Sequence, residues 1–397
     1  TGWLCGKDVN RTLDFTNPGA QQHLREVFAA MRGGIDGFMV DYCDDLWISE
    51  ASKGGFFCPY ATSTSFYRTF FKLAKEGLGA NSWLHERNLN QPNNDLTLGI
   101  VDSQRTSWDT DKISPDMVSR SGLRWYKNRV VLNYDMDSKE LNSSWKVTGF
   151  HGSDADGRRM MLTMAEIAGS RLLIANSFRD MSADVLHDLS RTFPYYSERR
   201  SARPVDAFVN NGWPRVYDFA VNSNWHQVVL YNNTLPTEAS DFSVPLSGDP
   251  VDGALGLAAD KDYYVYDFWN DRFVGRVKGS GRLNQNLRPG EARMLSIHEV
   301  EPNPQFLSTS RHIMQGFVDM AKLPEWILPD HVLRGASKVI GGETYEIVVA
   351  LNGSLPEKAR ATGGTIRIKP IPGDKNLVRL TIDSPINATI EWSLSCN

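Results

Sequence analysis

The stretch GIDGFMVDYC at residues 34–43 decides the fold that the sequence predicts. Residues 35–40 are apolar enough to form a buried strand, which ends at the carboxylate of Asp41. A helical pattern of apolar residues precedes this strand and ends at Gly33 and Gly34. Barrel enzymes place catalytic groups at the C-terminal ends of such strands, although an Asp there can equally cap a helix.

Strand and helix patterns alternate outward from this stretch, over residues 1–200. We expect strands at 35–41, 81–85, 96–102, 129–134 and 171–175, and helices within 16–34, 64–77, 158–168 and 182–191. A closed (β/α)8 TIM barrel needs eight such units, so about five units leave the barrel without its early strands. Either the sheet is open, or the early strands lie on another polypeptide.

The pattern changes after about residue 200. Short apolar segments separated by Pro, Gly and Asn predict all-β sandwich domains. We divide this part at Pro302-Asn303-Pro304. The expected domains are the C-terminal part of a catalytic barrel (1–200), a β-sandwich (201–302) and a second β-rich domain (303–397).

Composition excludes several classes of function. The chain has 397 residues and a net charge of -4, without a Lys/Arg-rich run that would indicate a nucleic-acid partner. No apolar stretch is long enough to span a membrane. No metal-binding spacing of Cys or His and no Gly-rich phosphate loop occurs, so we predict no metal and no cofactor.

Five glycosylation sequons and a start at Thr1 predict a secreted, mature glycoprotein. The four cysteines are compatible with disulfides in an oxidising compartment. The predicted glycosylation sites are Asn10, Asn142, Asn232, Asn352 and Asn387.

A second acidic cluster follows the strand expected at 96–102. It contains Arg105 with the carboxylates of Asp102, Asp109 and Asp111. Two carboxylates on either side of a sugar's anomeric carbon are the minimal equipment of a glycosidase. Together with Asp41, this cluster therefore predicts glycoside hydrolysis.

These motifs resemble glycoside hydrolase family 27, the α-galactosidases, and the related family 36. The nucleophile strand of that family reads Gly-x-Asp-x-x-Lys-x-Asp-x-Cys, so the resemblance implies that Asp41 is the nucleophile. Its Arg-x-x-x-Asp motif implies that Asp109 is the acid/base and Arg105 a sugar ligand. The resemblance also implies a disulfide between Cys5 and Cys43.

Further contacts follow from the same resemblance. Residues 132–137 loosely match the family's Asn-Asp-Pro-Asp-Met, which makes Asp135 a substrate ligand, and Trp108 lies beside Asp109. Met39 replaces the family's Lys, which normally holds galactose hydroxyls. In the divergent segment 83–87, Glu86 or His85 could contact the sugar, or Glu86 could pair with the next residue.

The resemblance implies a secreted retaining exo-glycosidase that acts on α-galactose-like residues. Related enzymes extend the expected sugars to α-N-acetylgalactosamine, β-L-arabinopyranose and isomalto-linked glucan. The resemblance also implies a companion chain that supplies the early barrel strands. A second hypothesis from another class is a carbohydrate-binding protein on a degenerate glycosidase scaffold.

Overall fold

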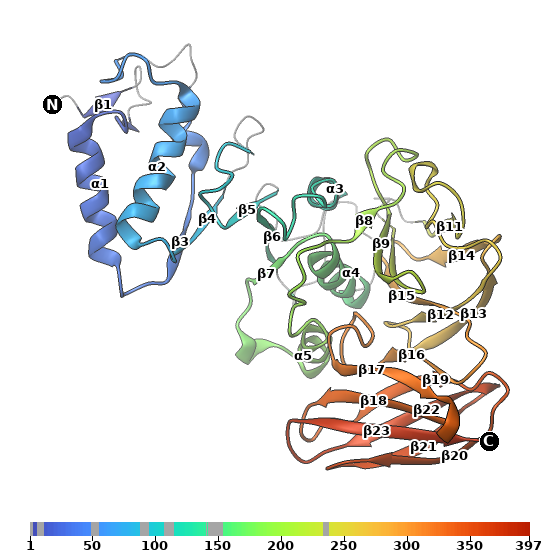
Figure 1. Cartoon of the computed structure of the whole chain (residues 1–397). Helices are drawn as coiled ribbons and strands as arrows, with labels where there is room; N and C mark the ends of the chain where they lie inside the picture. Colours follow the sequence, from blue (N-terminus) through green and yellow to red (C-terminus); the bar gives the residue numbers. More distant parts are fainter. Residues whose placement is uncertain are drawn as a thin grey trace.

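The chain is α/β in its first half and all-β in its second (Figure 1). The structure is a computed structural model and describes residues 3–5, 12–48, 55–87, 95–106, 115–139, 141, 154–232 and 238–397. The N-terminal helices lie at one end of the molecule and the C-terminal sheets at the other (Figure 1).

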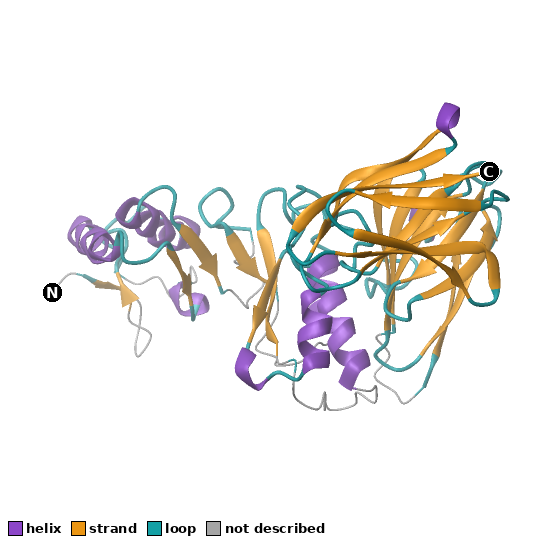
Figure 2. Cartoon of the chain, turned by 90° about the horizontal axis from the view of Figure 1, so that it is seen from below, coloured by secondary structure: helices purple, strands orange, loops and turns teal. Residues whose placement is uncertain are grey.

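One parallel sheet organises the first half. Its strands lie side by side in sequence order, and Figure 2 shows them in a row between the first helices and the β-rich part. The strands are β3 (Gly37–Val40), β4 (Trp83–Glu86), β5 (Ser103–Arg105), β6 (Asn133–Lys139) and β7 (Arg171–Ile174). The helices are α1 (Pro18–Met31), α2 (Ser63–Leu78), α3 (Pro115–Gly122), α4 (Asp154–Ile167) and α5 (Ala183–Ser190). Smaller elements are β1 (Leu4–Cys5), β2 (Thr12–Leu13), η1 (Cys43–Leu46) and η3 (Phe178–Asp180).

The first helices cover one face of this sheet. Phe28 of α1 and Phe71 of α2 are buried in one apolar cluster with Val40 of β3 and Leu84 of β4. Alternate residues of a strand point to opposite faces, so Met39 and His85 belong to the other face. That second face, which we call the inner face, carries the polar residues described below.

Two strands lie later in the sequence than we predicted. Residues 95–100 form turns instead of the strand expected at 96–102, and β5 begins at Ser103. Leu96, Leu98 and Ile100 still pack against the helix-side core, which explains their alternating apolar pattern. Similarly, β6 begins at Asn133 rather than near residue 129.

The second half consists of antiparallel sheets. Its first part pairs a six-stranded sheet with a two-stranded sheet over a shared apolar core. The strands are β8 (Arg203–Pro204), β9 (Val216–Asn222), β10 (Trp225–Tyr231), β11 (Ser240–Pro245), β12 (Asp262–Asp267), β13 (Arg272–Lys278), β14 (Arg282–Leu287) and β15 (Ala292–Glu299), with η4 at Pro250–Asp252.

The last part packs two four-stranded sheets against each other, with side chains of both in one core. One sheet has the order β16-β19-β22-β21 and the other β17-β18-β23-β20. The strands are β16 (Gln305–Thr309), β17 (Met320–Ile327), β18 (Val332–Val339), β19 (Tyr345–Ala350), β20 (Pro356–Ala361), β21 (Thr365–Ile371), β22 (Asp374–Asp383) and β23 (Ala388–Cys396), with η5 at Leu328–Asp330.

The α/β architecture and the following β-sheets agree with the predicted fold class. Within the described residues, the parallel sheet has five strands and two edges, at β3 and β7. A full (β/α)8 barrel is therefore not present in the described part of the chain. The predicted boundary near residue 303 falls between β15 and β16, and the division into domains stays a prediction.

A buried carboxyl group in α4 makes stability depend on pH. Glu166 is fully buried, and neither of its carboxyl oxygens has a hydrogen-bond partner among the described residues. Burial raises the pKa of Glu166 from 4.5 to about 8, although the positive charge of Arg129 opposes the shift. The native state therefore keeps this proton at neutral pH, whereas the unfolded chain releases it above about pH 4.5.

We expect the free energy of unfolding to fall as the pH rises from 4.5 towards 8, because the unfolded state then binds fewer protons than the native state. The loss from this group is on the order of 3 kcal/mol by pH 7. Urea unfolding at a series of pH values should show this slope in the wild type, and Glu166→Gln should remove it. The exposed Glu325→Gln should keep it, and a Glu166→Gln protein with the wild-type slope would contradict the assignment.

Candidate active site

Strand register places the polar residues of four strands on the inner face. Met39 lies opposite His85, and His85 lies opposite Ser103. Two residues after Ser103 on the same strand, Arg105 lies opposite Asp135, and Asp135 in turn lies opposite Arg171. Side chains at matched positions of parallel neighbours share a face, so these groups converge.

Asp41 follows β3 directly at its C-terminal end. Its side chain is 42% exposed, and its Oδ2 forms an ion pair with Nη1 of Arg87. Its Oδ1 accepts a hydrogen bond of 2.8 Å from the backbone N–H of Tyr42. The Arg87 N–H donates to the carbonyl of Val40 at 3.0 Å, which extends the pairing of β3 and β4 beyond both strands. Asp41 is thus a charged, accessible carboxylate in a fixed orientation.

His85 is the centre of a buried hydrogen-bond network on the inner face. The Ser103 Oγ lies 2.7 Å from the His85 Nδ1 and accepts hydrogen bonds from Trp83 Nε1 at 3.0 Å and from Arg171 Nη1 at 2.9 Å. The same Arg171 nitrogen lies 3.1 Å from the His85 Nδ1. Because a guanidinium group only donates, Nδ1 acts as an acceptor, and the ring carries its proton on Nε2.

The protonated Nε2 of His85 faces Asp135. The distance from Nε2 to Asp135 Oδ2 is 3.1 Å, and both residues are almost completely buried. Burial raises the pKa of Asp135, but the contact with His85, the backbone N–H of Asp137 and the positive charge of Arg171 outweigh it and leave the pKa below its ordinary value. Asp135 is therefore an ionised carboxylate on the inner face.

Arg105 is also buried on this face, with 2% of its side chain exposed. Its Nη2 forms an ion pair with Oδ2 of Asp137, and the backbone N–H of Asp137 donates to Asp135 Oδ1 at 2.6 Å. Asp137 has a positive φ of 78° and lies at an irregularity in the pairing of β6 with β7. The expected sugar ligand Arg105 is thus held by an adjacent carboxylate.

Glu86 lies on the opposite, helix-covered face and is fully buried. Its carboxylate accepts hydrogen bonds from Tyr67 of α2, from Thr97 and from Gln104, the last at 2.9 Å. This placement contradicts the substrate contact that we expected of Glu86, because the sheet separates it from Asp41. The neighbouring residues His85 and Arg87 face inward, because successive residues of a strand point to opposite faces of the sheet.

Several predicted residues lie outside the described part of the chain. Trp108 and Asp109 belong to the segment 107–114, which is not among the described residues. Asn10 and Asn142 also lie outside it. Met39 lies on the inner face with half of its surface exposed.

The expected disulfide is not present in the structure, where none of the four cysteines, all of them described residues, is joined to another. Cys5 and Cys43 are both buried in the same apolar cluster. Each thiol faces a backbone carbonyl instead: Cys43 Sγ lies 3.0 Å from the carbonyl of Val40, and Cys5 Sγ lies 4.0 Å from that of Leu13. The predicted Cys5–Cys43 bond is corrected accordingly.

Burial also corrects the predicted glycosylation of Asn232. This residue is 1% exposed, and its amide nitrogen donates to three carbonyls, among them that of Arg288 at 3.0 Å. The amide nitrogen of Asn352 likewise has three acceptors, including the carbonyl of Asn303 at 2.7 Å. Asn387 is exposed and uses only its amide oxygen in the bond to Gly341. Asn387 is therefore compatible with a glycan, and the glycosylation of Asn352 stays a prediction.

Among the described residues, no three His, Cys, Asp or Glu side chains are grouped to hold a metal ion. No helix in the described ranges has the length and apolar character needed to cross a membrane.

The comparison with solved structures confirms the resemblance at the level of fold: the similar structures are glycoside hydrolases of family 27. One is a β-L-arabinopyranosidase from Geobacillus stearothermophilus, with 17% identity and a TM-score of 0.51 over 72% of this chain and 63% of that one. A variant of that enzyme in complex with arabinose gives 18% identity and a TM-score of 0.52 over 73% and 65%.

The likeness to an α-galactosidase I from Mortierella vinacea is weaker, with 15% identity and a TM-score of 0.45 over 59% of this chain and 62% of that one. The chain thus spans less than two thirds of the length of these enzymes. No protein-family model and no curated protein matches the sequence.

Proposed function

We propose that the chain is the catalytic part of a secreted retaining exo-glycosidase. The observation that carries the proposal is the inner face: Asp41 stands accessible at the C-terminal end of β3, beside the buried polar residues of β4 to β7. Family 27 enzymes share the fold. A carboxylate beside a polar, sheet-lined floor suits a neutral, hydroxyl-rich substrate.

In the proposed reaction, Asp41 attacks the anomeric carbon, and the bond to the leaving oxygen breaks as Asp109 protonates that oxygen. The resulting glycosyl ester on Asp41 is hydrolysed by water, which Asp109 deprotonates. Asp135 and Arg105 would bind sugar hydroxyls, and Arg87 would hold Asp41 in its attacking orientation.

The proposed sugar is α-galactose-like, and β-L-arabinopyranose belongs beside it because that is the substrate named for two of the similar structures. A panel of aryl α- and β-glycosides that includes these sugars and α-N-acetylgalactosamine tests the proposal. Rapid hydrolysis of one member supports it and identifies the glycone. Binding of a sugar without hydrolysis of any member would favour the carbohydrate-binding alternative.

Arg87 supplies a positive charge to Asp41 in a chain where the family's Lys is replaced by Met39. We expect Arg87→Gln to lower kcat/KM on the best aryl glycoside by about 100-fold, because a preorganised charged donor at the reacting carboxylate is lost. Arg25→Gln, which breaks an exposed pair with Glu76, is the matched control and should leave kcat/KM unchanged. Equal kcat/KM values for the Arg87→Gln and Arg25→Gln variants would show that Arg87 does not act at the site.

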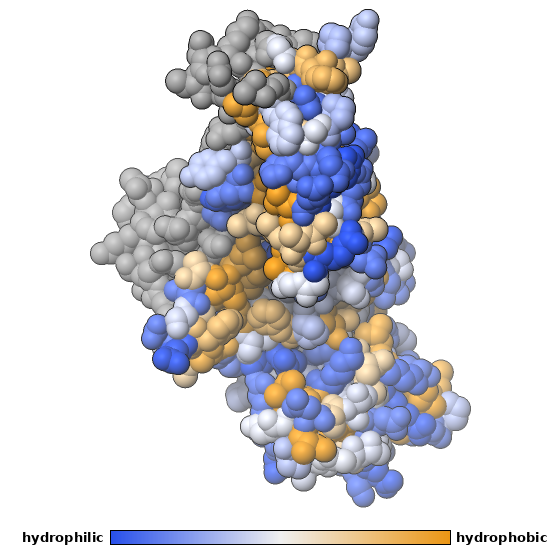
Figure 3. Space-filling view, turned by 90° about the vertical axis from the view of Figure 1, so that its left-hand side faces the viewer, coloured by the Kyte–Doolittle hydropathy of each residue, from blue (hydrophilic) through white to orange (hydrophobic). Residues whose placement is uncertain are grey.

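We further propose that a companion polypeptide supplies three strands that close the sheet into a (β/α)8 barrel. Among the described residues, β3 and β7 each have a strand partner on one side only, and unpaired parallel edges are unfavourable. Met39 and Trp83 expose apolar surface on the inner face. Figure 3 shows hydrophobic surface on the side of the molecule that lies at the left in Figure 1.

The companion is tested with native material. Size-exclusion chromatography followed by denaturing electrophoresis should show a second polypeptide that co-elutes with this chain and is required for hydrolysis. A chain that elutes alone and is fully active would contradict the proposal.

A further inference from the structure

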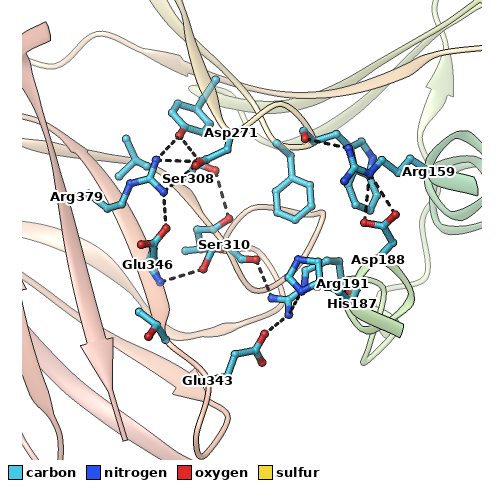
Figure 4. A pocket seen from close by; sticks show the side chains of 16 residues that line it. Arg159, His187, Asp188, Arg191, Asp271, Ser308, Ser310, Glu343, Glu346 and Arg379 are labelled. Atoms are coloured by element: carbon cyan, nitrogen blue, oxygen red, sulfur yellow. Dashed lines mark hydrogen bonds and ion pairs between the residues drawn. The ribbon is translucent and has the colours of Figure 1, made fainter. Parts of the chain in front are cut away.

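A pocket of about 420 Å³ lies where the helices of the first half meet both β-rich parts (Figure 4). We call it the junction pocket. Its walls come from α4 and α5, from the β12–β13 turn, and from β16, β19 and β22. No residue of its lining belongs to β3–β7, so it is separate from the candidate active site.

One wall of the junction pocket is an ion-pair cluster around Arg379. The Arg379 Nη1 lies 2.9 Å from Asp271 Oδ2 and also pairs with Glu346. The Tyr266 hydroxyl donates to the same Asp271 at 2.7 Å. These groups come from β12, β19, β22 and the β12–β13 turn, and Figure 4 shows them on one side of the pocket.

The opposite wall carries two further guanidinium groups. Arg191, at the end of α5, pairs with Glu343 and donates to the carbonyl of Ser310 at 3.0 Å. Arg159 of α4 lies 3.2 Å from Asp188 of α5. Every guanidinium group of the lining is thus already paired with a carboxylate.

The balance of charges in the lining determines which class of ligand the junction pocket can bind. The lining contains three Arg and four Asp or Glu residues, namely Arg159, Arg191, Arg379, Asp188, Asp271, Glu343 and Glu346. An anion would have to displace a carboxylate from its partner, because each of these guanidinium groups is already paired. A neutral molecule with hydroxyl groups can instead donate to the carboxylates and accept from the guanidinium groups without breaking any pair.

Two consecutive aromatic residues complete the lining. Phe268 and Trp269 are partly buried, with ring centroids 5.1 Å apart at an angle of 74°. The Trp269 ring is fixed by a 2.8 Å hydrogen bond to Thr163 and by the Arg159 guanidinium 5.1 Å from its centroid. Rigid aromatic surface beside paired charges suits the apolar C–H face and the hydroxyl edge of a sugar ring. The volume lies within the range of small-molecule sites.

We propose that the junction pocket binds one or two residues of a neutral saccharide, at a site remote from the proposed catalytic residues. The proposal does not depend on the catalytic one, because it uses no residue of the inner face.

The test uses isothermal titration calorimetry on the full chain carrying Asp41→Asn, so that bound probes are not hydrolysed. The probes are methyl α-galactopyranoside, methyl β-L-arabinopyranoside and isomaltose, with inorganic phosphate as the anionic probe. Phe268→Ala removes aromatic surface from the pocket, and Phe208→Ala is the matched control, since Phe208 is 78% exposed and lies outside the lining. Thr344→Trp blocks the pocket from an exposed position in its lining.

We expect at least one neutral probe to bind with an affinity that falls about tenfold in Phe268→Ala, disappears in Thr344→Trp and is unchanged in Phe208→Ala. Binding that neither pocket variant changes, absence of any neutral probe binding, or preferential phosphate binding would overturn the proposal. The same pocket variants with Asp41 intact should hydrolyse a small aryl glycoside at the wild-type rate. If the catalytic proposal is wrong, the hydrolysis measurement fails for every variant, whereas the calorimetric result is unaffected.

Discussion

Replacement of Asp41 by Asn is expected to lower kcat on the best aryl glycoside by roughly four to six orders of magnitude. The amide keeps the shape of the side chain but cannot form the glycosyl ester with the anomeric carbon. Initial rates with the same substrate, measured for both proteins at the same pH, give the ratio directly.

The matched control is Asp36→Asn. Asp36 precedes the same strand, β3, at its other end and is exposed, so its replacement should leave kcat within about twofold of the wild type. Circular dichroism of both variants establishes that the fold is kept. An Asp41→Asn protein with more than about a tenth of the wild-type rate would rule Asp41 out as the nucleophile.

The largest effect on stability is expected at Asp188, which is 2% exposed in α5. Its carboxylate holds two arginines of α4: Arg158 at 2.7 Å and Arg159 at 3.2 Å. Among the described residues, Asp188→Ala leaves the buried Arg158 with the exposed Asp184 as its remaining carboxylate, and an uncompensated buried charge costs about 3–5 kcal/mol. Thermal unfolding should show the transition of the first half lowered by roughly 10 °C.

Asp184→Ala is the control for this experiment. Asp184 pairs with the same Arg158 at 3.0 Å, but its side chain is 68% exposed, so its removal should cost less than about 1 kcal/mol. Similar midpoints for the two alanine variants would contradict the account of the buried cluster.

The sequence predicted the elements whose pattern follows from burial on one side. Helices α1, α2, α4 and α5 lie close to their expected ranges, because each buries an apolar stripe in a core cluster. Strand β3 was found for the same reason. The two misplaced strands, β5 and β6, are those whose inner faces are polar.

This polarity explains what sequence reasoning missed at the site. Ser103–Arg105 and Asn133–Lys139 look like strand ends followed by loops, since buried strands are expected to be apolar. In the structure they are the strands themselves, because their polar side chains satisfy one another across the inner face. Arg171 and Arg87 were missed because their partners come from other strands.

The alternation of side chains between the two faces of a strand, applied to residues 83–87, is the sequence signal that could have identified part of the site. It places Trp83, His85 and Arg87 on one face and Leu84 and Glu86 on the other. The choice between the faces still required the position of α2, whose Tyr67 holds Glu86. Likewise, burial of the Asn232 amide is invisible in a sequon.

The most direct test of the account is to trap the glycosyl ester on Asp41. A fluorinated glycosyl fluoride of the sugar that the panel identifies forms such esters, and they hydrolyse slowly. Peptide mass spectrometry after proteolysis should find one fluorosugar on the peptide that contains residues 37–43, attached at Asp41. A sugar attached to another carboxylate, or turnover of the reagent with no labelled peptide and an inverted product, would contradict the proposed nucleophile and the retaining mechanism.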